Sequence, residues 1–224
     1  MKHLILILFL YLITAQTVMA DNLHKGFVDI KTIIPYIELD MRYFSRDNFV
    51  GERIDAYEAN RCLITKETAS ALKKVQEDLS PFGLGLKVFD AYRPQSAVDH
   101  FVRWAKDLND TKMKQKYYPD VEKKNLFKEG YIAAKSGHSR GSSVDVTIIS
   151  LDNLQALDMG THWDFFGSLS WPHNLSLTSE QRAHRMLLQS LMLRHGFRAL
   201  KEEWWHFTLQ NEPYSDTYFD FKIK

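Results

Sequence analysis

The sequence lacks the features that would point to several classes of protein. Cys62 is the only cysteine among 224 residues, so no disulfide can form within the chain in an oxidising compartment. A lone cysteine of this kind is most simply a small, buried, apolar residue. Neither sign of charge dominates, because 29 Lys and Arg residues stand against 28 Asp and Glu residues. This balance offers no electrostatic attraction for nucleic acid or an anionic membrane, and neither is predicted as a partner.

Long hydrophobic runs are also absent, apart from one near the start of the chain. Lys2 precedes uninterrupted apolar residues at 4–13, and Val18 and Ala20 provide the small residues of a cleavage site. The run has about half of the roughly 20 residues that a membrane span needs, and the pattern is typical of a secretory signal peptide. We predict a signal at 1–20, one domain at 21–224, and a periplasmic protein without stable membrane association after cleavage. A retained anchor is the alternative.

Helical patterns occur at three places in the predicted domain. Thr65 can cap a helix that reaches Leu79. Thr178 and Gln181 form a capping box for another helix, which Gly196 ends. Between these two, Pro94 suits the first turn of a helix with inward-facing residues at Ala97, Phe101, Ala105 and Leu108.

Strand patterns fill most of the remaining sequence. Residues 27–43 predict one or two strands broken by Pro35, and further strands are predicted at 84–92, 142–149, 197–200 and 203–209. Residues 107–135 are expected to form a mixed loop with a short helix. Residues 151–178 form a long irregular connection, and such loops are often functional. The order predicts an α+β fold with a largely antiparallel sheet and helices on one side.

One histidine and one aspartate stand out near the middle of the chain. His138 lies in the small-residue segment KSGHSRGSS, and Asp145 follows within the apolar strand SVDVTII. A buried aspartate is costly unless it is paired or bound to a cation, and zinc accepts imidazole and carboxylate ligands. His206, in the aromatic segment EEWWHFTL, is the best third ligand. Taken singly, a packed core histidine, a surface histidine and an arginine-paired aspartate explain these residues more simply.

Glu203 adds a geometric requirement to this hypothesis. It precedes His206 by three residues, and positions three apart in an extended strand point to opposite faces. Glu203 must therefore lie at an irregular entrance to the strand if it shares a site with His206. A solvated charge next to Glu202 is its ordinary alternative.

Several motifs together resemble a known family. Ser136, His138, Gly141 and Asp145 form S-x-H-x-x-G-x-x-x-D, and E-W-W-H follows at 203–206. These motifs are similar to those of the zinc D-alanyl-D-alanine dipeptidases of the VanX type. That family belongs to the D-Ala-D-Ala metallopeptidases, which share a fold with the amino-terminal domain of hedgehog proteins. The similarity continues in DNFVG (47–51), ANRC (59–62), DAYRP (90–94), MGTHWDFF (159–166) and EPYSDTYFDF (212–221).

The resemblance implies a catalytic metal centre. His138, Asp145 and His206 would bind one zinc ion per chain and leave a fourth position for water. Glu203 would act as general base and then as general acid. Arg93 would stabilise the oxyanion of the tetrahedral intermediate. From D-A-Y-R-P alone, a structural pair with a carboxylate is the simpler role for Arg93.

The resemblance also implies a site for a small dipeptide substrate. Asp164 would bind its free ammonium group, with Ser136 as a second contact. Tyr43 and Tyr57 would line the pocket, although ordinary packing explains them equally well. The segment GSLSWPH (167–173) departs from the family pattern just beyond Asp164, so the resemblance defines the metal chemistry more closely than the substrate specificity.

The implied activity is hydrolysis of D,D-dipeptides or related cell-wall fragments in the periplasm. A D,D-carboxypeptidase acting on peptidoglycan stem peptides is the first alternative. A non-catalytic zinc-binding module is the second, although it would need neither Glu203 nor Arg93. The sequence makes no prediction of oligomeric state.

Overall fold

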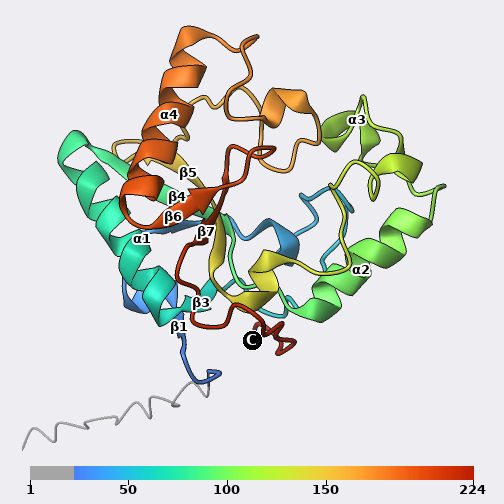
Figure 1. Ribbon diagram of the computed structural model, residues 1–224, viewed down its shortest axis with the longest axis horizontal. Helices are drawn as coiled ribbons and strands as arrows, with labels where there is room; N and C mark the ends of the chain where they lie inside the picture. The colour runs from blue at the N-terminus through green and yellow to red at the C-terminus, as the bar shows by residue number, and fades with distance from the viewer. Residues whose placement is uncertain (1–22) are drawn as a thin grey trace, which may run out of the picture.

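The computed structural model describes residues 23–224, so the predicted signal at 1–20 lies outside the described residues. Its main sheet has the strand order β2-β4-β5-β7-β6, and β1 and β3 form a separate pair (Figure 1). The strands are β1 Phe27–Asp29, β2 Glu38–Leu39, β3 Leu63–Thr65, β4 Leu84–Asp90, β5 Ser143–Ser150, β6 Phe197–Ala199 and β7 His206–Leu209. The helices are α1 Lys66–Leu79, α2 Gln95–Lys106, α3 Lys114–Tyr117 and α4 Ser179–Arg194. Every neighbouring pair in the main sheet except β2–β4 is antiparallel, which confirms the predicted α+β class.

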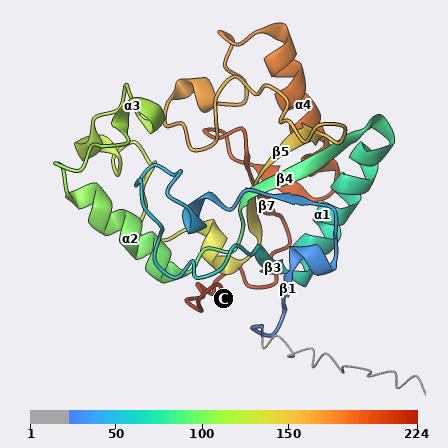
Figure 2. The same ribbon diagram turned by 180° about the vertical axis from the view of Figure 1, so that it is seen from behind.

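The helices do not all lie on one side of the sheet. α1 and α4 contact each other and pack against the sheet, whereas α2 lies on the opposite side of the molecule in both views (Figures 1 and 2). There Phe101 of α2 packs against Tyr43 and Phe49 from the segment between β2 and β3. The expectation of helices on one side is therefore wrong, because α2 buries its apolar face against a separate aromatic layer.

The ends of the helices follow local signals with two exceptions. The capping box of Thr178 and Gln181 opens α4 as predicted, and Gly196 follows the helix with a positive φ of 86°. Thr65 stands at the start of α1, but its hydroxyl hydrogen-bonds the Thr68 and Ser142 hydroxyls instead of a helix N–H. α2 ends at Lys106, so Leu108 is exposed and its predicted inward position is wrong.

Alternation along β5 separates the core from a polar face. Val144, Val146 and Ile148 are fully buried and belong to the hydrophobic core. Successive side chains of a strand point to opposite faces, so Asp145 faces away from these three residues. Asp145 lines the same cavity as Val98 and Phe101 of α2, so the face that carries it looks toward this helix. Among the described residues, no helix combines the length and the apolar character that crossing a membrane requires.

Candidate metal and catalytic site

The structure brings together the three residues predicted to bind a metal ion. His138 Nε2 lies 3.1 Å from His206 Nδ1 and 3.3 Å from Asp145 Oδ1. The third side of the triangle, from His206 Nδ1 to Asp145 Oδ1, measures 3.1 Å. Ligand bonds of about 2.0–2.1 Å in a tetrahedral zinc site place donor atoms roughly 3.3 Å apart. The three donors therefore match one face of a zinc tetrahedron.

Each ligand is held by a different structural element. Asp145 lies in β5 and is paired in register with His206, the first residue of β7. His138 lies in the 3-10 turn Gly137–Arg140, and the Ser136 side chain caps this turn by accepting from the His138 N–H. A sheet and a capped turn are rigid supports, which suits a preorganised metal site.

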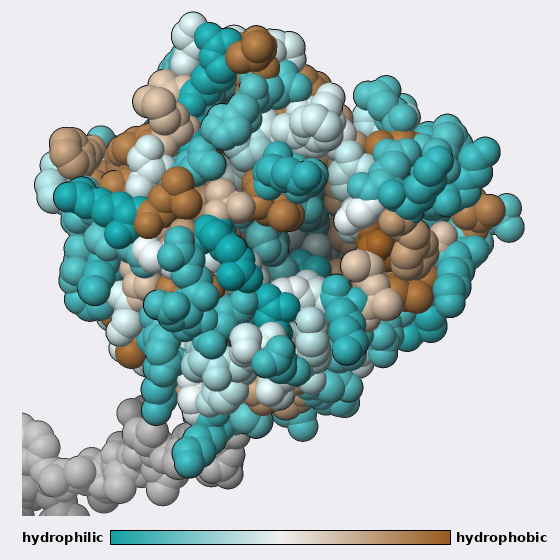
Figure 3. All heavy atoms as spheres, viewed as in Figure 1, coloured by the Kyte–Doolittle hydropathy of each residue, from teal (hydrophilic) through white to brown (hydrophobic). Residues whose placement is uncertain are grey.

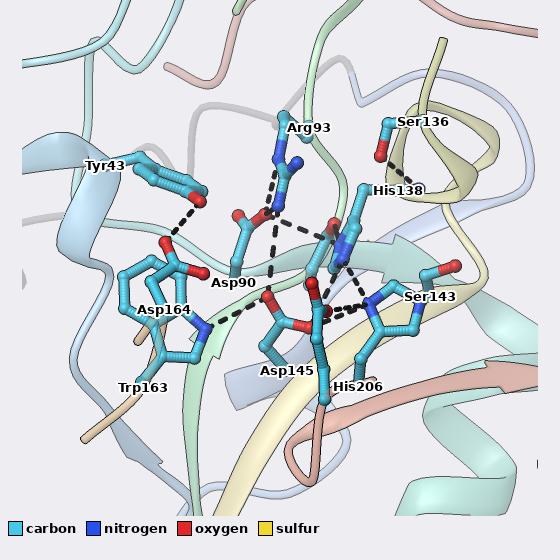
Figure 4. A network of polar contacts seen from close by, with 12 residues as sticks. Tyr43, Asp90, Arg93, Ser136, His138, Ser143, Asp145, Trp163, Asp164 and His206 are labelled. Carbon is cyan, nitrogen blue, oxygen red and sulfur yellow. Dashed lines mark hydrogen bonds and ion pairs between the residues drawn. The ribbon is translucent and has the colours of Figure 1, made fainter. Parts of the chain in front are cut away.

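Further contacts orient the donor atoms (Figure 4). His138 Nδ1 lies 2.7 Å from the Ala91 carbonyl oxygen and donates to it, which leaves Nε2 as an unprotonated donor atom. The Trp163 indole N–H donates to Asp145 Oδ2 at 3.1 Å, so Oδ1 is the oxygen that faces the two histidines. Burial alone would raise the pKa of Asp145, but the neighbouring imidazoles of His138 and His206 hold that pKa below its ordinary value. Asp145 is thus kept as an anion.

Glu203 lies at the irregular entrance to β7, as its spacing from His206 required. It stands in the turn before the strand, where the His206 N–H lies 3.4 Å from the Glu203 carbonyl oxygen. Its Oε2 lies 3.7 Å from His206 Nδ1. Burial raises the pKa of Glu203 to about 7, which is close to the value that suits a general base at neutral pH.

Arg93 combines the two roles that the sequence left open. Its Nε and Nη2 donate to Asp90 Oδ2 at 2.9 and 2.8 Å, so it has a structural carboxylate partner. It also lines the cavity above the three ligands, and its guanidinium carbon lies 4.9 Å from the centre of the Tyr43 ring. Arg93 can therefore present N–H groups to a bound molecule while its charge is balanced.

The cavity beside the metal ligands has a volume of about 240 Å³. Figure 3 shows this face of the molecule hollowed near its centre, with hydrophobic side chains gathered toward α2. The cavity has a charged side and an aromatic side; it is lined, among others, by Tyr43, Phe49, Arg93, Phe101, Ser136, Asp164, Phe166 and Glu203. Such a volume is on the scale of a small-molecule site.

Asp164 is held in an unusual backbone conformation inside this cavity. Its φ of 59° lies in the left-handed region, which costs a residue other than glycine about 1–3 kcal/mol. The Tyr43 hydroxyl donates to Asp164 Oδ2 at 2.6 Å. Burial and the neighbouring Asp145 raise the pKa of Asp164 well above its ordinary value, so a cationic partner would stabilise the ionised form.

Tyr57 differs from expectation. It does not line the cavity; it is fully buried, and its hydroxyl donates to Asp90 Oδ1 at 2.6 Å. Its expected place in the pocket is therefore corrected to a position behind Asp90. Asp90 itself was missed, although its place three residues before Arg93 in D-A-Y-R-P was a signal for an ion pair. His162 is not among the three grouped donors, and its two ring nitrogens contact the Trp163 and Lys116 carbonyl oxygens.

The sequence is similar to those of known proteins over most of its length. The sequence model of an M15 peptidase family, described as D-ala-D-ala dipeptidase, matches residues 23–224. The chain is 39% identical over 201 residues to a D-alanyl-D-alanine dipeptidase of Enterococcus faecalis, covering 90% of this chain and 100% of that protein. It is 40% identical over 197 residues to a D-alanyl-D-alanine dipeptidase of Streptomyces coelicolor, covering 88% of this chain and 98% of that protein. The solved structure of a D,D-pentapeptidase VanY in complex with Zn(II) is more distant. It has 15% sequence identity and a TM-score of 0.42, and the match covers 69% of this chain and 77% of that chain.

Proposed function

Since this chain belongs to the D-ala-D-ala dipeptidase family of M15 metallopeptidases, we propose that it hydrolyses D-alanyl-D-alanine and related D,D-dipeptides with one zinc ion. The proposal depends chiefly on the triangle of donor atoms from His138, Asp145 and His206, with sides of 3.1–3.3 Å. Glu203, Arg93 and Asp164 line the same small cavity. The site therefore offers a metal position, a base, an oxyanion donor and an anion for the substrate's ammonium group.

The residues divide the chemistry among themselves. Zinc bound at the three ligands would polarise the scissile carbonyl and lower the pKa of water. Glu203 takes the proton of the attacking water and later passes it to the leaving amine. Arg93 donates to the oxygen that becomes negatively charged, and loss of one such donor typically costs about 2.7–4 kcal/mol.

Asp164 sets the preference for a free dipeptide. A buried carboxylate pairs well with an ammonium group, whereas acylation of the substrate's amine removes that charge and leaves the carboxylate unpaired. The cavity of about 240 Å³ has the scale of a small-molecule site. The buried carboxylate of Asp164 therefore supports a dipeptidase over a D,D-carboxypeptidase.

The test compares D-Ala-D-Ala with N-acetyl-D-Ala-D-Ala as substrates of the zinc-loaded protein. We expect the free dipeptide to have the higher kcat/KM. A preference for the acetylated form would support the carboxypeptidase instead. If the protein bound zinc but hydrolysed neither, the non-catalytic zinc module would be favoured.

We also propose that residues 1–20 direct export, so that the substrate is a periplasmic product of cell-wall turnover. The support is the sequence pattern of a charged start, a short apolar run and small residues at 18 and 20. A reporter that is active only outside the cytosol, fused after Lys224, should be active. Retention of the fusion in the cytosol would contradict this location.

A further inference from the structure

An irregularity in the sheet turns a second carboxylate toward the metal ligands. Along the β4–β5 ladder, Val88 pairs with Val146, and the next pair is Asp90 with Asp145, with a register shift between them. An extra residue in one strand re-aims the side chains that follow it. Asp90 therefore shares the face of Asp145 instead of pointing into the core behind it.

Asp90 is fully buried, and both of its oxygens have partners. Oδ1 accepts from the Tyr57 hydroxyl at 2.6 Å. Oδ2 accepts from Arg93 Nε and Nη2 at 2.9 and 2.8 Å and lies 3.4 Å from His138 Nδ1. Asp90 does not line the cavity, so any effect it has on a bound substrate must pass through a neighbour.

Arg93 stands between two carboxylates. Its Nη2 lies 2.8 Å from Asp90 Oδ2 and 3.9 Å from Asp145 Oδ2. In a buried site an unbalanced guanidinium moves toward the nearest anion. Without Asp90 the nearest anion is Asp145, a predicted metal ligand. An ion pair between Arg93 and Asp145 would reduce the negative charge that Asp145 offers the metal, and it would turn the guanidinium away from the cavity.

We propose that Asp90, held by Tyr57, is a positioning residue that aims Arg93 at the reacting carbonyl and keeps it away from Asp145. This inference rests on the proposed function, since it takes Arg93 as the oxyanion donor. Asp90 holds the Nε–Nη2 edge of the guanidinium. The guanidinium carbon lies over the rings of Tyr43 and Phe101, 4.9 and 5.3 Å from their centres. The Asp90 carboxylate and the two rings together set the direction in which the remaining N–H groups of Arg93 point.

The first experiment replaces Asp90 by Asn in the zinc-loaded protein. We expect kcat for D-Ala-D-Ala to fall about 100-fold, the scale of losing one oxyanion donor, with KM changed less than about threefold. Zinc content should stay at one ion per chain. Asp99→Asn, at an exposed position on α2, is the matched control and should leave kcat unchanged. A loss of zinc that accounts for the fall in kcat would overturn the proposal.

A double-variant cycle separates positioning from a general structural role. In an Arg93→Met background, Asp90→Asn should lower kcat by about twofold or less, because Asp90 acts through the side chain already removed. Equal loss in both backgrounds would overturn the inference. Should Asp90→Asn fail to fold, Tyr57→Phe replaces it in both backgrounds, with an expected loss of about fivefold that likewise disappears without Arg93.

Failure of the proposed function gives a different result. If Arg93→Met alone left kcat unchanged, the assignment of Arg93 as oxyanion donor would be wrong, and the role of Asp90 with it. If Arg93→Met lowered kcat but Asp90→Asn did not, only the inference about Asp90 would be overturned.

Discussion

Asp145 and His206 face each other directly across the ladder between β5 and β7, with Asp145 Oδ1 3.1 Å from His206 Nδ1. The pairing joins residues 61 positions apart in the sequence. Because a strand register is strongly specified where one face is buried, the distance between these two ligands is set by the core. The proposed metal position is therefore built into the fold itself.

Removal of a metal ligand should remove the metal. We expect His206→Ala to contain little zinc, because two remaining donors cannot enclose the ion, and hydrolysis should be lost with it. Chelation of the unaltered protein should abolish hydrolysis, and added zinc should restore it. His195→Ala is the control, since His195 pairs with Asp78 near the surface and should keep one zinc ion. Stoichiometric zinc in His206→Ala, measured by elemental analysis, would show that the ligand set is wrong.

Glu203→Gln should separate metal binding from catalysis. The amide keeps the size of the side chain but cannot accept a proton, so kcat should fall by about 10²–10⁴-fold. Zinc content should not change, because Glu203 is not one of the three donors. Glu202→Gln, next in sequence and paired with Lys201, should retain activity. Survival of turnover in Glu203→Gln would mean that another group is the base.

Asp164→Asn should remove the preference for a free amine. Asparagine tolerates the left-handed backbone found at this position, so the change tests charge rather than folding. We expect kcat/KM for D-Ala-D-Ala to fall about 100-fold, a tenfold loss for each roughly 1.4 kcal/mol of lost pairing. The value for N-acetyl-D-Ala-D-Ala should change little. Asp152→Asn, at an exposed position after β5, is the control; an equal loss for both substrates would contradict the role of Asp164.

Arg185→Met tests what holds the loop that carries Asp164. Arg185 of α4 is buried and donates to the Met159, Leu169 and Trp171 carbonyl oxygens; burial lowers its pKa to about 10. Without it, three carbonyls lose their donors, and the free energy of unfolding should fall by about 3 kcal/mol or more. Urea denaturation measures this change. Arg194→Met, exposed on the same helix, should stay within about 0.5 kcal/mol.

Much of the fold could be predicted because its signals are local. The capping box of Thr178 and Gln181 needs only two residues three positions apart, and the apolar run around Asp145 indicates a buried strand. The position of α2 across the sheet could not be predicted. Its partners Tyr43 and Phe49 come from the segment between β2 and β3, which holds only the short 3-10 turn Arg42–Phe44 and therefore shows no strand or helix period.

The candidate site, like the fold, could be predicted only in part. The types and spacing of His138, Asp145, Glu203 and His206, together with the family motifs, were sufficient to predict a metal centre. By itself, the sequence determined which chemical groups are present and which helices and strands carry them. The tertiary structure alone decided that Asp90 turns toward Asp145, that Tyr57 lies behind it, and that Tyr43 meets Asp164. These contacts depend on a register shift and on packing between distant segments, which neighbouring residues in the sequence do not specify.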